Sequence, residues 1–327
     1  MSNLSVPAIP RNKVGLLRTM YKYRWAYILL LPVIAFFIIF HYVPMYGIVL
    51  AFKKYAIRKG ILGSPWIGLT NFERLFGSAM FLRTIRNTLL ISLYRILFGF
   101  PMPILFALML NELSNARFKK AVQTISYLPH FISWVILGGI LTELLSPTRG
   151  AINYLLQLLG CEPIYFMAQS KYYRSILVLS GIWKEMGWSS IIYLAAIAGI
   201  PTEQYEAAAI DGASRLKCMW YITLPSIMSV VSIQLIMSIG GILSGGFDQV
   251  FNTYNSLLYE TGDIIDTYAY RVGLEGKMDY SLSTAISLFK NGIGFVLVVG
   301  TNWTAKKLSH GEGGISAPWT ANCTRFR

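Results

Sequence analysis

Long apolar segments alternate with shorter polar ones along this chain. A helix needs about 20 mainly apolar residues to cross a bilayer, and six segments meet that length: residues 25–50, 87–110, 121–145, 173–199, 227–249 and 283–304. Four prolines lie inside the first two segments, which membrane helices tolerate where neighbours satisfy the freed carbonyls. The pattern predicts an all-α polytopic protein with six transmembrane helices in a domain spanning 25–305, between an N-terminal segment 1–24 and a tail 306–327.

Two of the connecting segments carry helical signals of their own. In TNFERLFGSAMFLRTI, apolar residues recur at helical spacing after Thr70 and Asn71, so either residue could cap a helix lying on the membrane surface. A second short helix is expected at about 150–159.

The polar loop between spans four and five, residues 201–226, is unusually ordered. Pro201 is expected to end span four, Thr202 to cap a short helix, and Glu203 to suit its positive N-terminal end. Gly212 supplies a left-handed stop. Ser214 then caps a second short helix through Trp220. The prediction is two short helices lying across the membrane face.

The spacing of residues in this loop resembles the EAA signature of ABC importer permeases. That signature is E-A-A-x3-G-x9-I-x-L-P, and every fixed position is present: Glu206, Ala207, Ala208, Gly212, Ile222, Leu224 and Pro225. WKEMGWSSIIYLAAIAGIPTEQYEAAAIDGA, YLPHFISWVILGGIL and FHYVPMYGIVLAFKKY are similar to the branch of the family that imports complex oligosaccharides. Within that branch the chain resembles permease subunits of alginate importers.

The resemblance implies a non-catalytic subunit and a set of partners. In that family the loop is a coupling helix that docks on an ATPase, so Glu206, Ala207, Ala208, Asp211, Gly212, Ile222, Leu224 and Pro225 are the candidate coupling residues. The implied partners are a second permease, expected to form a heterodimer, two ABC ATPase subunits and an extracytoplasmic solute-binding protein. No Walker A motif is present, so this chain is expected to bind no cofactor, and ATP and Mg²⁺ would be used by the partner ATPase.

The distribution of basic residues says little about orientation. With the N-terminus inside, the inner segments carry 14 Lys and Arg and the outer segments carry 12, so the positive-inside rule hardly discriminates. The family resemblance implies that the EAA loop faces the cytoplasm. The expected location is therefore the bacterial inner membrane, with both termini cytoplasmic.

Composition agrees with a membrane protein and argues against other classes. Only 13% of the residues are charged, against about 25% in ordinary soluble domains. The net charge of +14 is interpreted as basic loops next to anionic lipid rather than nucleic-acid binding, since no basic stretch belongs to a polar folded module. The three Cys and three His residues are too scattered for a metal site.

Polar residues inside predicted spans are functional candidates by default. Lys184 and Glu185, flanked by Trp183 and Trp188, either form an internal salt bridge that locks packing or line a translocation path for a sugar. The same alternatives of structural pairing and pathway lining hold for three further candidates: Arg95, Gln234 and Asn291, the last beside Lys290.

Two other features of the spans have less direct interpretations. The spacing Gly241-x-x-x-Gly245 permits close helix packing, and a gate hinge is the alternative. His130, which follows Pro129, is interpreted as a structural hydrogen-bonding residue rather than a proton relay.

The first outer segment has seven basic residues and one acid, Glu73. Attraction to lipid headgroups explains this charge, and so does an acidic binding protein or substrate, such as uronate oligosaccharides of the alginate type. The competing function class is an ion-coupled secondary transporter of sugars. That class predicts inverted repeats, which are not detected, and leaves the EAA loop unexplained.

Overall fold

The structure is a computed structural model that describes residues 21–276 and 278–308. Within these ranges every regular element is a helix, apart from one isolated β-bridge between Lys53 and Trp66. The longer helices are α2 (Arg24–Phe37), α6 (Ala79–Tyr94), α7 (Pro101–Glu112), α8 (Ala116–Tyr127), α9 (Trp134–Leu144), α11 (Ser170–Ala198), α15 (Met228–Gly240) and α19 (Tyr280–Leu308). The predicted N-terminal segment and tail lie mostly outside the described residues.

Shorter helices connect the long ones or interrupt them. The α-helical pieces are α3 (Val43–Met45), α4 (Gly60–Gly63), α5 (Thr70–Phe76), α10 (Ala151–Leu158), α12 (Thr202–Ile210), α13 (Arg215–Cys218), α14 (Leu224–Ser226), α16 (Phe247–Thr253), α17 (Tyr259–Gly262) and α18 (Ile265–Tyr270). The π-helical turns are η1 (Ile38–Tyr42), η4 (Arg95–Gly99), η7 (Met219–Thr223) and η10 (Arg271–Glu275). The 3₁₀ turns are η2 (Tyr46–Phe52), η3 (Ile57–Lys59), η5 (Leu128–Phe131), η6 (Phe166–Ala168), η8 (Ile242–Ser244) and η9 (Ser256–Leu258).

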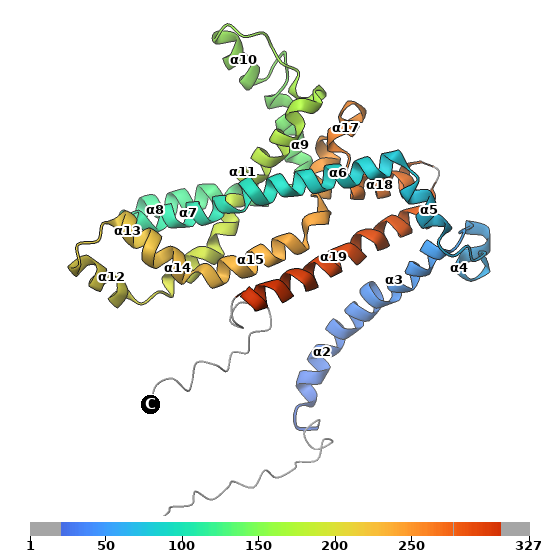
Figure 1. Ribbon diagram of the computed structural model, residues 1–327, viewed down its shortest axis with the longest axis horizontal. Coiled ribbons are helices and arrows are strands. Elements are labelled where there is room, and N and C mark those ends of the chain that lie inside the picture. Colours follow the sequence, from blue (N-terminus) through green and yellow to red (C-terminus); the bar gives the residue numbers. More distant parts are fainter. Residues whose placement is uncertain (1–20, 277, 309–327) are drawn as a thin grey trace, which may run out of the picture.

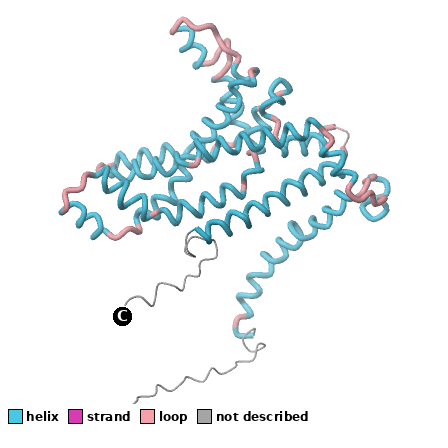
Figure 2. The backbone as a smooth tube through the Cα atoms, viewed as in Figure 1, coloured by secondary structure: helices cyan, strands magenta, loops and turns pink. Residues whose placement is uncertain are grey.

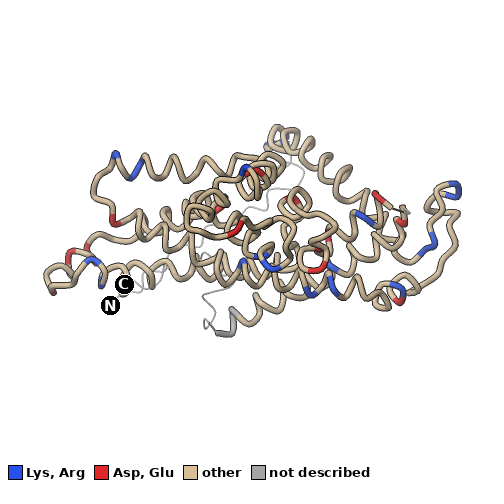
Figure 3. Tube along the Cα trace, turned by 90° about the horizontal axis from the view of Figure 1, so that it is seen from above, with Lys and Arg blue, Asp and Glu red and all other residues tan. Residues whose placement is uncertain are grey.

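Most of the long helices, among them α6, α7, α8, α15 and α19, lie along one axis, whereas α9 projects away from it with α10 at its tip (Figures 1 and 2). Helices α12 and α13 form one end of the molecule, which we call the loop end, and α4 and α5 form the opposite end. Lys and Arg residues occur at both ends of this axis, as the coloured trace in Figure 3 shows. Helix α2 diverges from the remaining helices, and no residue of it is buried (Figure 1).

Three helical stretches of the described chain are long and apolar enough to cross a membrane: Arg24–Phe52, Ala79–Glu112 and Tyr280–Thr304. Two bent pairs raise that number to five if each pair is one span. These stretches overlap five of the six predicted spans. The remaining predicted span, span four, corresponds to α11, which has 29 residues but does not meet the same test of apolarity. Its first turns and its middle carry several charged side chains, among them Lys171, Arg174 and Lys184.

Spans three and five are broken, which the apolar pattern does not reveal. Ala116–Phe131 and Trp134–Leu144 meet at 101°, next to Pro129, and Arg215–Ser226 and Met228–Gly240 meet at 60°. The predicted fifth span was too long, since α15 ends at Gly240 rather than at residue 249. Gly245 and Gly246 have φ of +50° and +76°, a left-handed conformation that glycine adopts without a Cβ penalty.

The two glycines of Gly241-x-x-x-Gly245 flank a break instead of lying on one helix, but close packing is present at Gly245, where a Cβ would lie 2.9 Å from the Ile264 side chain. Gly240 is the glycine here that packs against another span: a Cβ on it would lie 2.5 Å from a methyl group of Val298 on α19.

The connecting helices match the predictions in part. Helix α10 was predicted almost to its ends. Helix α5 also forms, but neither Thr70 nor Asn71 caps it, because Leu69 is the N-cap residue. Thr70 is already helical and donates its hydroxyl to the carbonyl of Ile67, while the buried Asn71 amide donates to the carbonyls of Ala51 and Lys53. Asn71 thus ties α5 to the end of the first span.

Buried apolar side chains form separate clusters along the axis. One cluster near the loop end joins α7, α11 and Ile227, with Leu108, Tyr193 and Ile197 among its members. Another, toward the opposite end, surrounds Tyr173 of α11. Helix α11 belongs to both clusters. This packing fixes the positions of its side chains, several of which line the cavity described below.

Candidate functional site

The first candidate site is the EAA loop, which starts with α12. Thr202 was expected to cap this helix, but it is the first helical residue, and Pro201 occupies the N-cap position without a side-chain cap bond. The reason lies in the backbone: Pro201 has ψ of 133°, so the turn into the helix falls one residue earlier. Glu203 lies in the first turn, as predicted, where a negative charge is favourable.

Gly212 ends α12 as the sequence predicted. Its φ is +73°, and the Ala213 N–H donates to the carbonyl of Ala208 while the Gly212 N–H donates to that of Ala209. This pair of bonds is a Schellman motif, which satisfies the last carbonyls of a helix and requires a left-handed residue. The angle between α12 and the next helix is therefore set by Gly212.

The return to the membrane is also ordered by local bonds. The Ser214 hydroxyl accepts from the Lys217 N–H at the start of α13, which confirms the predicted cap. The chain continues through the wide turn η7, and the Tyr205 hydroxyl lies 2.9 Å from the Thr223 hydroxyl. Because Thr223 is buried, this bond anchors α12 to the membrane-proximal part of the loop.

Most of this loop is exposed on the surface of the protein. No residue of α12 is buried, and Glu206, Ala207, Asp211 and Gly212 are exposed, while Ala208 is half-buried. Large apolar side chains are exposed beside them: Ile210 (87%), Leu216, Trp220 and Tyr221. Exposed apolar groups next to small residues and charges are typical of a protein-binding surface.

The remaining residues of the motif occupy a different position. Leu224 packs against the apolar cluster near the loop end, and Ile222 is half-buried. Pro225 is exposed, in the last turn before the 60° bend into α15. These three residues connect the exposed surface to the spans.

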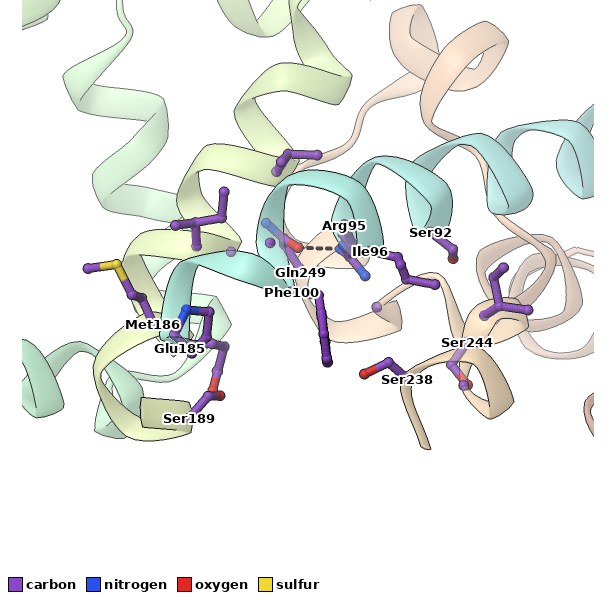
Figure 4. A pocket seen from close by; sticks show the side chains of 18 of the residues that line it. Ser92, Arg95, Ile96, Phe100, Glu185, Met186, Ser189, Ser238, Ser244 and Gln249 are labelled. Carbon is purple, nitrogen blue, oxygen red and sulfur yellow. Dashed lines mark hydrogen bonds between the residues drawn. The ribbon is translucent and has the colours of Figure 1, made fainter. Parts of the chain in front are cut away.

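The second candidate site is a cavity of about 500 Å³ between the spans. Figure 4 shows side chains from η4, α11, the end of α15 and α16 around it. Its polar lining comprises Ser92, Arg95, Glu185, Ser189, Gln234, Ser238, Ser244 and Gln249, and its aromatic lining comprises Phe100, Trp134 and Tyr193. The lining combines hydrogen-bonding groups with flat apolar faces.

Arg95 is held at the cavity wall by a network that joins η4, α11 and α16. Its guanidinium donates to the side-chain oxygen of Gln249 (Figure 4). The Gln249 amide in turn donates to the Leu177 carbonyl at 2.7 Å and to the Ser180 hydroxyl at 2.9 Å. The guanidinium also lies against Gly246, where a Cβ would come within 2.3 Å of it. The break at Gly246 thus makes room for Arg95.

Arg95 has no carboxylate partner among the described residues, because no Asp or Glu oxygen lies within 4 Å of it. Glu185 is the acid that lines the cavity. Its carboxylate lies 2.8 Å from Nδ1 of His130 and 3.7 Å from Nζ of Lys184. The cavity therefore contains one cation paired only with a neutral amide, and one anion paired outside the cavity.

Only some of the residues that the sequence predicted to line a substrate pathway lie in the cavity. Arg95, Glu185 and Gln234 line the cavity. Lys184 does not: it is 5% exposed and donates to the carbonyls of Pro129 and His130 at the break in span three. Since neighbours on a helix point about 100° apart, Glu185 can line the cavity while Lys184 faces the break.

Three further candidates also lie outside the cavity. Trp183 is 51% exposed on the outer side of α11, and Asn291 is exposed on α19. Trp188 stacks on His130, with ring centroids 4.5 Å apart and planes 2° from parallel. This stacking, together with the His130–Glu185 contact, agrees with the structural role predicted for His130.

Sequence reasoning missed several lining residues. Ser189 and Tyr193 follow Glu185 at intervals of four residues on α11, and Ser238 follows Gln234 in the same way, so helical spacing could have found them. Gln249 had no such signal, because it follows the break that the apolar pattern did not predict. Trp134 reaches the cavity only because span three bends.

The geometry can bind a hydroxyl-rich ligand. Serine, glutamine and arginine side chains offer donors and acceptors, aromatic rings offer apolar faces, and Arg95 offers an unneutralised positive charge to an acidic group. Within the described residues no group of three or more His, Cys, Asp or Glu side chains could hold a metal ion.

The chain is similar to known bacterial proteins over most of its length. The chain is 45% identical over 300 residues to the polygalacturonan/rhamnogalacturonan transport system permease protein YteP of Bacillus subtilis, covering 92% of each chain. It is 43% identical over 284 residues to protein LplB of the same organism, covering 87% of this chain and 89% of LplB.

A solved structure is also similar, that of a bacterial ABC transporter involved in the import of the acidic polysaccharide alginate. The match has a TM-score of 0.83 and 42% identity, and it covers 90% of this chain and 99% of the matched chain. A second structure with the same score shows a bacterial alginate ABC transporter with an alginate pentasaccharide-bound periplasmic protein.

The family match covers the first site and most of the second, although Ser92, Arg95 and Ile96 lie before its first residue. Residues 99–303 match the family described as binding-protein-dependent transport system inner membrane component. This range contains the whole EAA loop and most of the cavity lining. The ion-coupled transporter class is not supported by any of these matches. The chain therefore belongs to the family of binding-protein-dependent transport system inner membrane components, the permease subunits of ABC transporters.

Proposed function

We propose that this chain is one of two permease subunits in an ATP-driven importer of acidic oligosaccharides. The second permease, two ATPase subunits and an extracytoplasmic binding protein complete the assembly. The loop end faces the cytoplasm in this arrangement, together with both termini. ATP and Mg²⁺ act on the ATPase subunits, and this chain binds neither.

The observation that carries the substrate class is the position of Arg95. Its guanidinium lines a cavity rich in hydroxyl and amide groups, and its partner there is the neutral Gln249. An unneutralised guanidinium in a partly desolvated site favours a carboxylate ligand over a neutral one. Polygalacturonan and alginate, named for a relative and for a structural neighbour, are both polymers of uronic acids.

The experiment compares an acidic substrate with a neutral form of the same sugar. Cells that express the complete transporter are supplied with labelled uronate oligosaccharides or with the same molecules after their carboxyl groups are reduced to alcohols. Arg95→Gln removes the charge and keeps hydrogen-bonding capacity. We expect uptake of the uronate form to fall at least about tenfold, the effect of losing about 1.4 kcal/mol of a charge-assisted bond.

Uptake of the reduced form serves as the internal control and should change little. If Arg95→Gln lowers uptake of both forms equally, Arg95 supports the structure rather than recognising charge. If the wild-type transporter takes up neither form, the substrate class is wrong.

Coupling through the EAA loop is tested separately. Glu206 is exposed on α12, and Glu206→Lys reverses its charge without disturbing an internal contact. We expect the ATPase to be lost when the complex is purified through this chain. Gln204→Lys, an exposed position on the same helix, is the matched control. Unchanged ATPase recovery with Glu206→Lys would contradict the docking role.

A further inference from the structure

A second groove lies beside the cavity, between α11 and the helices α6 and α7. Its volume is about 700 Å³, and its lining residues are Tyr94, Phe98, Met102, Ser170, Lys171, Arg174, Ser175, Val178, Leu179, Ile182 and Thr261. Only Val178 and Ile182 are shared with the cavity described above. The groove therefore opens on a different face of α11, and the proposed transport function leaves it unused.

The groove changes from polar to apolar along its length. On α11 its first residues are Ser170, Lys171, Arg174 and Ser175, and its later residues are Val178, Leu179 and Ile182. Both α11 and the α6–α7 stretch run toward the loop end (Figure 1). The polar part of the groove is thus the part farther from the loop end.

The facing helix shows the same change. Tyr94, Phe98 and Met102 recur every four residues along its groove side. Tyrosine is enriched where the headgroup region meets the hydrocarbon core, because its ring is apolar and its hydroxyl is polar. Tyr94 lies next to the polar part of the groove, and Phe98 and Met102 follow it along the apolar part.

The two cations of the groove are not neutralised by the protein. Arg174 donates from Nε to the Thr261 carbonyl at 3.2 Å and from Nη2 to the Asn87 side-chain oxygen at 2.9 Å, so both of its partners are neutral. No Asp or Glu oxygen of the described chain lies within 4 Å of Lys171 or Arg174. Arg86 on α6 adds a further positive charge that repels Arg174. An anion at this point would relieve the repulsion.

The apolar part of the groove is open to the surroundings of the protein. Leu179 is 66% exposed and Phe98 is 54% exposed. From Lys171 to Ile182 the helix rises about 16 Å at 1.5 Å per residue. That length corresponds to about half of the 30 Å hydrocarbon core, which is the depth of one leaflet.

We propose that this groove binds one anionic phospholipid, with its phosphate between Lys171 and Arg174 and an acyl chain along Phe98, Leu179 and Ile182. The lipid belongs to the leaflet farther from the loop end. Its headgroup neutralises the two cations, and its chain covers the apolar wall between α6 and α11. The site therefore ties lipid composition to the packing of two helices that also line the cavity.

The first experiment measures lipid selectivity. The purified full chain in neutral detergent is titrated with phosphatidylglycerol or phosphatidylcholine, and bound lipid is counted by native mass spectrometry. We expect phosphatidylglycerol to bind more tightly. In the double variant Lys171→Gln/Arg174→Gln this preference should fall about 25-fold, at about fivefold for each cation near the headgroup.

The matched control is Arg58→Gln/Lys59→Gln, which removes two exposed cations outside the groove. It should keep the preference for phosphatidylglycerol. An equal loss in both double variants would mean a diffuse charge effect and would overturn the site. Displacement of the lipid by inorganic phosphate alone would overturn it as well, because the acyl chain would then contribute nothing.

The second experiment identifies the occupant in the membrane of living cells. A photoreactive benzophenone amino acid replaces Leu179 and is activated by light in cells that express the complete transporter. We expect an adduct with the mass of a phospholipid, which is lost when Lys171→Gln/Arg174→Gln is combined with the label. An adduct with another polypeptide would show that a protein helix fills the groove, and would overturn the proposal.

Discussion

The ammonium group of Lys184 lies 2.5 Å from the backbone carbonyl oxygen of His130. It also donates to the carbonyl of Pro129, so one side chain of α11 satisfies two acceptors at the break in span three. A broken helix leaves carbonyls without their usual N–H donors, and an unsatisfied buried group is costly in a membrane. Lys184 therefore holds the bend that brings Trp134 to the cavity.

Replacing Lys184 should destabilise the protein. In Lys184→Met the His130 carbonyl loses its donor, while the Pro129 carbonyl keeps the bond from the Ile132 N–H. We expect a loss of about 1–3 kcal/mol in the free energy of unfolding. The measurement is the apparent melting temperature in detergent, with Lys120→Met on the exposed side of α8 as the control. A variant with unchanged melting temperature and reduced uptake would instead indicate that Lys184 contacts the substrate.

A close approach between α11 and α8 gives a second prediction. A Cβ on Gly187 would lie 2.2 Å from the carbonyl oxygen of Ser126, which belongs to the backbone and cannot rotate away. Gly187→Ala should therefore separate α11 from α8 and lower stability by about 1–3 kcal/mol. Gly292→Ala on α19 is the control, because a Cβ there meets no atom within 4 Å.

The two glycine substitutions should have different effects on the melting temperature. Alanine favours a helix over glycine by up to about 1 kcal/mol, so Gly292→Ala should raise the melting temperature slightly or leave it unchanged. If Gly187→Ala behaves in the same way, the two helices do not pack as closely as described.

A buried ion pair in the segment between spans five and six gives a third prediction. Asp263 is fully buried and binds Arg271, with 2.6 Å between Oδ2 and Nη2, as well as the Thr267 hydroxyl. Asp263→Asn leaves the guanidinium without its counter-charge, and breaking such pairs costs about 3–5 kcal/mol. Thermal unfolding should therefore begin well below that of the wild type.

The exposed pair Arg74–Asp279 provides the contrast. The Arg74 side chain is 53% exposed, and solvent screens such pairs to about 0–1 kcal/mol. Asp279→Asn keeps the acceptor for the Leu282 N–H and should change the melting temperature little. Equal effects of the two substitutions would contradict the difference in burial.

The basic segment between the first two spans predicts a salt-dependent rate. Two of its cations have specific partners: Lys53 donates to the carbonyls of Ile61 and Leu62, and Arg74 binds Asp279. Lys54, Arg58 and Lys59 have no acid within 4 Å among the described residues, and Arg58 and Lys59 are exposed. Such charges attract an acidic substrate or binding protein until salt screens them beyond about 10 Å at 0.1 M.

The initial rate of uronate uptake should accordingly fall as ionic strength rises. Replacing Lys54, Arg58 and Lys59 by Gln should lower the rate at low salt and flatten its dependence on salt. A rate that does not respond to ionic strength in the wild-type transporter would leave lipid attraction as the explanation for these charges.

The sequence predicted the EAA loop well because its structure is local. Gly212 and Ser214 act on backbone groups within five residues of themselves, so spacing alone indicates the stop and the cap. Two local details were wrong. Pro201 rather than Thr202 is the N-cap residue, because the cap depends on backbone angles rather than on residue preference. The helix that follows Ser214 continues to Ser226 instead of ending at Trp220.

The cavity could be predicted only in part. Polar residues in apolar spans drew attention to Arg95, Glu185 and Gln234, and all three line it. The same reasoning placed Lys184 and Trp188 beside them, although both contact the break in span three. Sequence patterns mark a polar residue in a span but do not show the direction in which it points.

The sequence by itself determined the membrane class, most of the apolar helices and the local structure of the EAA loop, because these follow from apolar length and from short-range hydrogen bonding. Only the tertiary structure decided where spans three and five break and which side chains meet. Gln249 reaches Arg95 across 154 residues because Gly246 leaves space for the guanidinium. Contacts of that kind depend on how distant helices pack, and the apolar pattern of each helix alone does not record them.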